Sequence, residues 1–232
     1  MRKGSRPKKK QTQEKMIHAA VTLFLEKGYR ETKTAEISGK AGFSPAMFFS
    51  CFPDKEAVLR ALTGHMFDSQ FAAVESLLGH GHDPVLLYCV ETSLQLHIAE
   101  LSEALRDLYV TAYTLPTTSE YIYQKTAPRL AAIFGPYLTG YAEKDFYELE
   151  IASAGAVRGY MTKPCDMYFT VEQKISRFLE AALKIYEVPQ ETRRQMTEQV
   201  LSMDLRGMAQ MLISQIVKRA ESGFEREGTE DG

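Results

Sequence analysis

Apolar residues recur every three or four positions along most of this chain, which is the spacing of amphipathic helices. Such patterns run through residues 16–25, 54–78, 84–113, 119–134, 145–161, 171–186 and 190–220. No segment shows the sustained alternation of apolar and polar residues that a half-buried strand would show. The chain is therefore predicted to be all-α, without internal repeats.

Turn signals divide the first sixty residues into short helices. Gly28 ends the first one, Thr34 can cap a second, and Gly42 turns the chain. Ser44–Pro45 begins a third helix, because a hydroxyl cap followed by proline is a frequent helix start, and Pro53–Asp54 begins a long one. Two short helices joined at a glycine turn form a helix-turn-helix. A first helix must cover their small core, for which the candidates are Ile17, Phe24, Ile37, Phe48 and Phe52.

Proline and glycine also divide the rest of the chain. The Gly-His-Gly-His sequence at 79–82 is a break, after which Asp83–Pro84 starts a helix predicted to reach Tyr113 with some interruption. Pro116 is predicted to end it, and Pro128 is a predicted kink or boundary. We expect four segments in the chain. They are a flexible basic arm (1–11), the helix-turn-helix domain (12–60), a larger helical domain (61–222), and a flexible acidic tail (223–232).

The charge is unevenly distributed. The formal net charge is only −2, yet residues 1–60 carry 13 Lys and Arg against 6 Asp and Glu, and the remainder is acidic. A basic end on an acidic body indicates a site for a polyanion. The alternative is a solubilising basic tail, since many of these charges lie in the first ten residues.

Several classes of protein are disfavoured by the sequence. No apolar run approaches the roughly 20 residues that span a bilayer, and no secretory signal is recognisable, so a cytoplasmic protein without a membrane partner is expected. Cys51, Cys89 and Cys165 form no metal-binding or disulfide pattern, and the pair His80 and His82 lies in a glycine-rich loop. No catalytic motif with a plausible context is present. We therefore expect no enzyme, no metal and no cofactor.

A lysine at the start of the long helix points to a phosphate. Glu56 suits the first turn, because the helix dipole favours anions there, whereas Lys55 does not. An external anion held by the free backbone N–H groups would explain the lysine. Lys55 is therefore predicted to contact a phosphate of a nucleic acid; the alternative is a solvated surface lysine.

A set of residues between positions 14 and 62 has a characteristic spacing: Ala19, Ala20, Leu23, Phe24, Gly28, Tyr29, Thr32, Ile37, Ala41, Gly42, Phe43, Ser44, Phe48, Phe49, Phe52, Lys55 and Glu56. In these residues the segment resembles the TetR family of transcriptional regulators. The resemblance implies a dimeric DNA-binding protein, usually a repressor, whose larger helical domain (here 61–222) binds a small-molecule effector and dimerises.

The chain departs from the family pattern in the helix that would read bases. Ala46 stands where the family usually has glycine, Phe49 where a phosphate-contacting tyrosine is usual, and Cys51 where tyrosine or histidine is common. The stretch 44–52 contains no Arg, Lys, Asn or Gln, so the usual bidentate contacts with bases are absent.

We expect this helix to read bases through apolar contacts. Met47 and Ala46 are predicted to contact thymine methyl groups, while Ser44 and Ser50 supply weak hydrogen bonds. Phosphate contacts from lysines and the basic arm would then supply most of the affinity, which would depend strongly on salt. The predicted DNA-binding residues are Lys33, Thr34, Lys40, Ser44, Pro45, Ala46, Met47, Phe49, Ser50 and Lys55.

Tyrosines concentrate in the larger domain, where ten of the twelve lie between Tyr88 and Tyr168. Tyrosines that face inward could line a pocket for an aromatic or amphipathic effector, since each combines a flat apolar ring with a hydroxyl group. The alternative is an ordinary role in the core or on the surface. The candidate ligand-binding residues are Tyr109, Tyr113, Tyr137 and Tyr141.

The helix predicted at 190–220 carries an apolar stripe that needs a partner. Burial within the same chain is one account; the family resemblance favours a homodimer through the C-terminal helices, in which two reading helices bind a palindromic operator. Tilting the helix at 54–78 would change the separation of the two reading helices, which would make operator affinity responsive to a ligand. A second function remains open, namely a helical protein-interaction module that keeps the fold without reading DNA.

Overall fold

The computed structural model describes residues 5–225, and these residues form eleven α-helices. The part of the chain described contains no strand, in agreement with the predicted all-α class. The helices are α1 (Ser5–Glu31), α2 (Thr34–Lys40), α3 (Pro45–Cys51), α4 (Lys55–Leu78), α5 (Pro84–Ala99), α6 (Glu103–Ala112), α7 (Pro116–Phe134), α8 (Glu143–Thr162), α9 (Val171–Ile185), α10 (Gln190–Leu201) and α11 (Leu205–Glu225).

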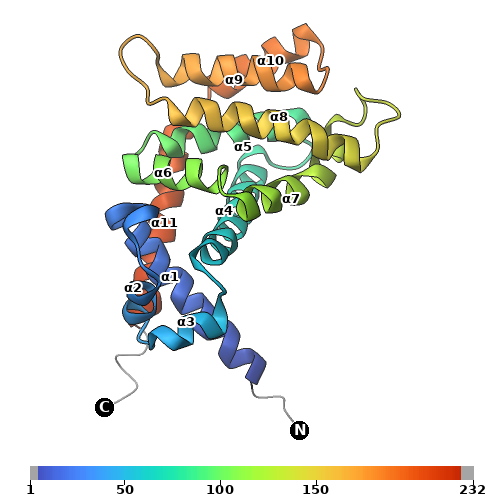
Figure 1. Cartoon of the computed structure of the whole chain (residues 1–232). Coiled ribbons are helices and arrows are strands. Elements are labelled where there is room, and N and C mark those ends of the chain that lie inside the picture. Colours follow the sequence, from blue (N-terminus) through green and yellow to red (C-terminus); the bar gives the residue numbers. More distant parts are fainter. Residues whose placement is uncertain (1–4, 226–232) are drawn as a thin grey trace.

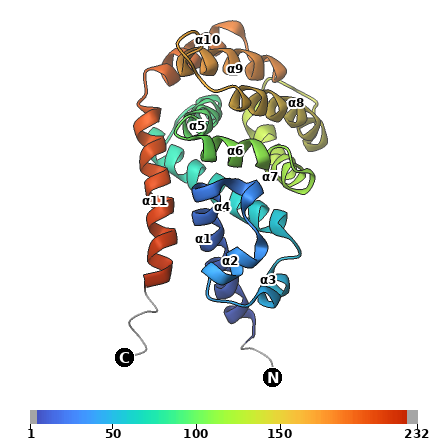
Figure 2. The same ribbon diagram turned by 60° about the vertical axis from the view of Figure 1, so that its left-hand side comes forward.

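The helices form a small domain and a larger one. Figures 1 and 2 show α1, α2 and α3 at one end of the molecule and α8, α9 and α10 at the other. Helix α4 leads from α3 into the larger domain, where it packs against α5 and α7. Helix α11 returns alongside the body towards the small domain and packs against both α5 and α1 (Figure 2). Two helices distant in sequence therefore connect the domains.

The small domain has the core that the sequence predicted. Ile17, Phe24, Ile37, Phe48 and Phe52 are all buried, and each is at most 8% exposed. The turn between α2 and α3 contains Gly42 with φ of 79°, a conformation that glycine adopts without strain. These five side chains belong to the buried cluster that packs the short helices against α1.

The N-terminal segment differs from the prediction of a flexible arm. Helix α1 begins at Ser5, so residues 5–11 are helical. Pro7 does not prevent this, because it lies in the first turn, where backbone N–H groups have no partner within the helix. Residues 223–225 likewise belong to α11. The remainder of the predicted arm and tail, residues 1–4 and 226–232, lies outside the described residues.

Caps divide two of the predicted long helices. The segment 84–113 is split by Ser102, whose hydroxyl accepts a hydrogen bond from the Leu105 N–H. The segment 190–220 is split before α11, where the Asp204 carboxylate accepts the Gly207 N–H at 2.9 Å. Short polar residues inside an apolar pattern thus start new helices by bonding free N–H groups. Pro116 begins α7 instead of ending the preceding helix, and α7 continues through Pro128.

A buried ion pair joins three parts of the larger domain. Lys174 on α9 is fully buried, and its Nζ lies 2.5 Å from the Glu100 carboxylate at the end of α5. Glu100 also accepts hydrogen bonds from the Arg106 side chain and from the Cys165 N–H. A charge removed from water in this way stabilises the fold only while its partner is present.

Replacing Lys174→Met should destabilise the protein by about 3 kcal/mol, because Glu100 loses its closest counter-charge within the fold. Urea unfolding followed by helical circular dichroism measures this. The matched control is Lys184→Met on the same helix, whose ion pair with Glu180 is exposed and should be worth less than about 1 kcal/mol. Equal unfolding midpoints for the two variants would contradict the assignment.

Candidate DNA-binding surface and internal cavity

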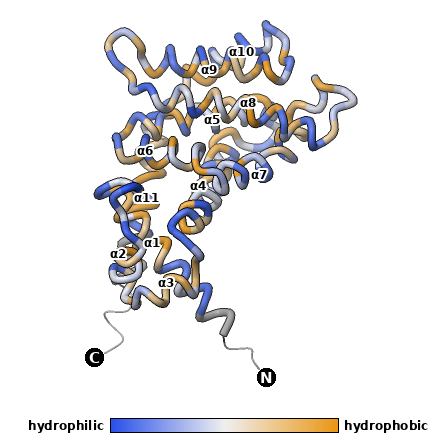
Figure 3. The backbone as a smooth tube through the Cα atoms, viewed as in Figure 1, coloured by the Kyte–Doolittle hydropathy of each residue, from blue (hydrophilic) through white to orange (hydrophobic). Residues whose placement is uncertain are grey.

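The outer face of α3 is exposed and mainly apolar. Phe49 is 60% exposed and Met47 is 41% exposed, and Pro45 and Ala46 are also exposed. The Ser50 hydroxyl is exposed too, but it donates to the Ala46 carbonyl of its own helix. Figure 3 shows this apolar helix at the base of the molecule, beside the hydrophilic first part of α1. The face is free to meet a partner from solution and carries few polar groups that could read bases.

Two capping details differ from the prediction. Lys33, not Thr34, stands at the N-cap of α2, and its N–H donates to the Glu36 carboxylate at 2.8 Å. Thr34 is the first helical residue and is half-buried. Ser44 does stand at the N-cap of α3, but its side chain makes no capping hydrogen bond. Its hydroxyl therefore does not hold the start of this helix.

Exposed lysines lie on the elements around α3. Lys33 precedes α2, and Lys40 ends it with its Nζ 3.5 Å from the Glu26 carboxylate. Lys9 and Lys10 are exposed on the first turns of α1, which extend at the same end of the molecule as α3 (Figure 1). The basic N-terminal segment is thus held beside α3 by a helix.

The structure corrects the role predicted for Lys55. Its ammonium group donates to the Tyr29 and Thr32 carbonyls, at 2.7 Å each, and to the Arg30 carbonyl at 3.2 Å. It also lies 4.3 Å from the centre of the Tyr29 ring. All three donors of the ammonium group are therefore used at the end of α1, where carbonyl groups lack partners within the helix. Lys55 ties α4 to α1 and has no donor left for a phosphate.

The neighbouring Glu56 accepts hydrogen bonds at the start of another helix. Its Oε1 accepts the Thr117 N–H at 2.8 Å and the Thr118 N–H at 3.0 Å, and the Thr118 hydroxyl also donates to it. The carboxylate thus caps the start of α7, where the helix dipole favours a negative charge. Burial opposes ionisation, but these hydrogen bonds outweigh it and lower the pKa of Glu56. The sequence placed Glu56 correctly in the first turn of α4 but gave no sign of a distant helix as its partner.

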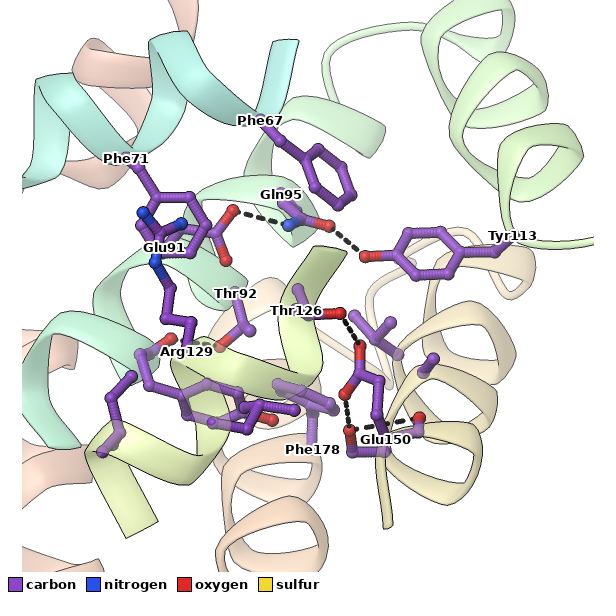
Figure 4. Close-up of a pocket in the computed structure, with 16 residues that line it drawn as sticks. Phe67, Phe71, Glu91, Thr92, Gln95, Tyr113, Thr126, Arg129, Glu150 and Phe178 are labelled. Atoms are coloured by element: carbon purple, nitrogen blue, oxygen red, sulfur yellow. Dashed lines mark hydrogen bonds between the residues drawn. The ribbon is translucent and has the colours of Figure 1, made fainter. Parts of the chain in front are cut away.

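The larger domain contains a small cavity of about 30 Å³. Figure 4 shows side chains from several helices directed towards it. The walls combine aromatic rings with polar groups, and two of the lining residues are acids. The lining residues are Phe67, Phe71, Tyr88, Glu91, Thr92, Gln95, Tyr113, Thr126, Arg129, Leu130, Ile133, Glu150, Ser153, Ala154, Val157 and Phe178.

One hydrogen-bonded chain in the cavity begins at Glu91 on α5. The Gln95 amide donates to Glu91 Oε1 at 2.6 Å, and the Tyr113 hydroxyl donates to the Gln95 carbonyl at 2.9 Å (Figure 4). Burial raises the pKa of Glu91 to about 7, although the Gln95 hydrogen bond and the charge of Arg129 oppose the rise. A buried carboxyl of this kind changes charge near neutral pH.

A second group surrounds Glu150 on α8. The Thr126 hydroxyl donates to Glu150 Oε1, and the Ser153 and Tyr186 hydroxyls donate to Oε2. Burial raises the pKa of Glu150 to about 7 as well, against the effect of these three hydrogen bonds. Both oxygens of Glu150 are thus already bonded within the protein.

The four predicted tyrosines have different positions. Tyr113 lines the cavity, whereas Tyr109 is buried beside a smaller void, where it accepts a hydrogen bond from Gln70. Tyr137 is half-buried outside the cavity lining, and Tyr141 is 47% exposed. Composition could indicate an aromatic pocket but not which rings face it, because that depends on how the helices pack. The buried acids were missed because glutamates within helices usually face solvent.

Comparisons with known proteins agree with this architecture. Residues 16–62 match the family model of bacterial regulatory proteins, tetR family. Two relatives from Bacillus subtilis (strain 168) are the uncharacterised HTH-type transcriptional regulators YuxN and YvkB. YuxN is 30% identical over 79 residues, which are 34% of this chain and 27% of YuxN. YvkB is 34% identical over 68 residues, which are 29% of this chain and 36% of YvkB. The alignments thus span only about a third of either relative.

Solved structures extend the likeness over the larger domain. RolR in complex with resorcinol has a TM-score of 0.65 at 20% identity, covering 83% of this chain and 95% of RolR. FadR from Thermus thermophilus, a TetR family transcriptional repressor in complex with lauroyl-CoA, has a TM-score of 0.57 at 20% identity, covering 77% of this chain and 96% of FadR. At this identity the likeness shows the shared fold. Residues 16–62 thus match the tetR family of bacterial regulatory proteins, and the chain as a whole shares the fold of these solved structures.

Proposed function

We propose that the protein is a ligand-responsive transcriptional regulator, a repressor that binds a palindromic operator as a homodimer. One observation carries this proposal: an exposed helix-turn-helix and an internal cavity are connected by side-chain contacts at the start of α4. The two relatives are HTH-type transcriptional regulators, and RolR and FadR form complexes with resorcinol and lauroyl-CoA, which is consistent with the proposal. Its target, chromosomal DNA, would place the protein in the cytoplasm. None of the helices in residues 5–225 is both long and apolar enough to cross a bilayer.

Apolar contacts would read the bases. Met47 and Ala46 are exposed on α3 and would meet the methyl groups of thymines in the major groove. Phe49 would lie against the edge of the groove. Lys33, Lys40 and the basic start of α1 would contact phosphates, and the Lys40–Glu26 ion pair would open on binding. Most of the affinity would then depend on salt.

Dimerisation is proposed through the exposed face of α8. The apolar stripe of α11 largely faces α1 and α5 of the same chain, so it is less available for a second copy than the sequence suggested. Ile151 on α8 is 46% exposed. Among the described residues nothing lies over Gly155 or Gly159, which follow it at intervals of four. Two such faces could approach closely across a twofold axis.

The route from cavity to DNA would run through α7. Thr126 and Arg129 of α7 line the cavity, and the first turn of the same helix is capped by Glu56. Lys55, the neighbouring residue, bonds the end of α1. A ligand that shifts α7 would therefore shift the start of α4 and, with it, the orientation of the helix-turn-helix. Release of DNA requires the ligand to favour the shifted state.

The exposed apolar face of α3 also fits a second function. Met47 and Phe49 would suit a protein partner as well as a DNA groove. Fluorescence titration with random duplex DNA at two salt concentrations separates the two functions. A DNA-binding protein should bind with an affinity that falls steeply as salt rises.

If α3 reads bases as proposed, the affinity for DNA should depend on thymine methyl groups. For duplexes selected from random DNA, replacing a contacted thymine by deoxyuridine should weaken binding about fourfold, because one buried methyl group is worth about 0.8 kcal/mol. Met47→Ala should remove the difference between the two bases. Uracil placed outside the half-sites is the control. Equal affinity for thymine and uracil duplexes throughout the half-sites would contradict methyl recognition.

The same duplexes test the corrected role of Lys55. Lys33→Ala should lower the slope of log K against log salt by about 1, as expected for one lost phosphate contact. Lys55→Ala should leave the slope unchanged and lower thermal stability instead, because its ammonium group bonds carbonyls of α1. A drop of about 1 in the slope for Lys55→Ala would restore the phosphate assignment.

The dimer proposal predicts that Ile151→Glu yields a monomer in light scattering, because a charge would be placed at the centre of the interface. Operator affinity should then fall by about 100-fold or more, since one half-site contact alone is weak. The matched control is Leu77→Glu, which changes a similarly exposed apolar residue, 53% exposed, on α4. A dimeric Ile151→Glu protein would exclude this face.

The coupling proposal predicts that Glu56→Gln uncouples α7 from DNA binding. In the wild-type protein, operator DNA should slow hydrogen–deuterium exchange at Thr117 and Thr118, since linkage between two sites is reciprocal. In Glu56→Gln this response should be lost while binding of DNA remains. Glu120→Gln on α7, which removes a charge away from the cap, is the control. An unchanged response in Glu56→Gln would rule out this route.

A further inference from the structure

The cavity contains two acids and no closely paired cation. Glu91 and Glu150 are only 3% and 6% exposed. Within residues 5–225 neither has a basic side chain within ion-pairing distance. Arg129 is the one basic residue of the lining, and its guanidinium lies on the Phe71 ring, 3.4 Å from the ring centre. With both acids ionised the lining would carry one negative charge in excess, and a buried charge without a partner is costly.

The cavity contains a hydrogen-bond acceptor that is not fully used. The Gln95 amide donates to Glu91, the Tyr113 hydroxyl donates to Gln95, and the Thr126 hydroxyl donates to Glu150. Glu150 is bonded at both oxygens. Glu91 accepts at Oε1 alone among the described residues, which leaves Oε2 for a ligand. A ligand that donates a hydrogen bond can therefore be held at Glu91 Oε2.

Aromatic rings surround this acceptor. Phe67 and Phe71 extend from α4 and Tyr113 from the position directly after α6, on the side of the cavity where the Glu91 carboxyl lies (Figure 4). Ring faces attract cations and also bury flat apolar groups. A ligand with a positive charge at one end and a flat apolar body would satisfy both the carboxylate and the rings. It would also bring the net charge of the lining to zero.

Building on the proposed function, which makes this cavity the effector site, we propose that the effector is an organic cation, a protonated amine on an aromatic or similarly flat body. Its ammonium group binds Glu91 Oε2, and its body packs among Phe67, Phe71 and Tyr113. Because the cavity is only about 30 Å³ in this structure, these rings must move apart to admit the body. Glu150 contributes negative charge without a direct contact, because its oxygens are already bonded. The two acids disfavour an anionic ligand of the same shape, and the cationic Arg129, stacked on the Phe71 ring, only partly offsets them.

Protons compete with such a ligand. Glu91 is faced by Arg129 of α7, Glu150 of α8, and Tyr109 and Tyr113 at the end of α6; the lining residues of α4 are apolar. The cation binds the ionised carboxylate, so its affinity falls as pH drops through a pKa of about 7. Between pH 8 and pH 6 the ionised fraction falls by about tenfold, and the affinity should fall with it.

The experiment uses three probes of similar shape and different charge: 2-phenylethylamine, 2-phenylethanol and 3-phenylpropanoate. The whole protein is titrated with each at pH 8, in thermal denaturation and in calorimetry, without DNA. The amine should raise the Tm and give measurable binding, while the alcohol and the carboxylate should bind at least tenfold more weakly. Stabilisation by bound ligand follows from mass action. Equal binding of the alcohol, or tighter binding of the carboxylate, would overturn the proposal.

Variants and pH identify the carboxylate. Glu91→Gln, which keeps the shape and removes the charge, should weaken the amine at least tenfold, whereas Glu148→Gln on the exposed side of α8 should not. If Glu91→Gln does not fold, the affinity of the wild-type protein for the amine is compared at pH 6 and pH 8 instead. The amine stays protonated at both pH values, so a change in affinity reports the carboxylate. Affinity that is unchanged by Glu91→Gln, or by pH, would overturn the assignment. Since these readouts need no DNA, failure of DNA release with intact amine binding would count against the proposed effector role alone.

Discussion

Two adjacent charges at the start of α4 hold the domains together. Lys55 donates to carbonyl groups at the end of α1, and Glu56 accepts N–H groups at the start of α7. Each charge satisfies backbone groups that lie at a helix end and cannot be paired within their own helix. Each also has the sign that the local helix dipole favours. One turn of helix therefore contacts both the DNA-binding domain and the larger domain, in addition to the packing of α1 on α6 and α11.

This arrangement explains why the lysine has no phosphate role. Its donors are all used within the protein, so the basic character needed for DNA comes from other residues. Lys33, Lys40 and the helical start of α1 lie around α3, whose own exposed residues are apolar. In the proposed complex, electrostatic attraction and base recognition would be supplied by different elements. The first would position the protein on the DNA backbone, and the second would discriminate sequence.

In the cavity, by contrast, two acidic side chains are buried without a close counter-charge among the described residues. Glu91 and Glu150 are buried, and a carboxyl in such surroundings is more stable when it is neutral or paired. The folded protein therefore carries two groups whose charge changes near neutral pH, on helices that pack around α7 and α8. Residues retained at this cost in stability often serve a ligand. The adjacency of the cavity to α7, and of α7 to Glu56, gives ligand binding a physical path to the DNA-binding domain.

The sequence by itself determined the features that depend on neighbouring residues. Apolar spacing gave the all-α class, and Gly42, Ser44–Pro45 and Asp54 placed the turns of the helix-turn-helix, because capping and periodicity act within a few residues. Polar caps inside an apolar pattern were harder to recognise, as the helix breaks near Ser102 and Asp204 show.

Only the tertiary structure decided which distant groups meet. It turned Lys55 towards α1, placed Glu56 against α7, brought two glutamates into an aromatic cavity, and laid α11 along α1. The spacing of residues in the sequence does not reveal these contacts, because a long side chain can reach any helix that packs nearby. The direction of each charged side chain was fixed by which unpaired backbone group or void the packed helices placed within its reach.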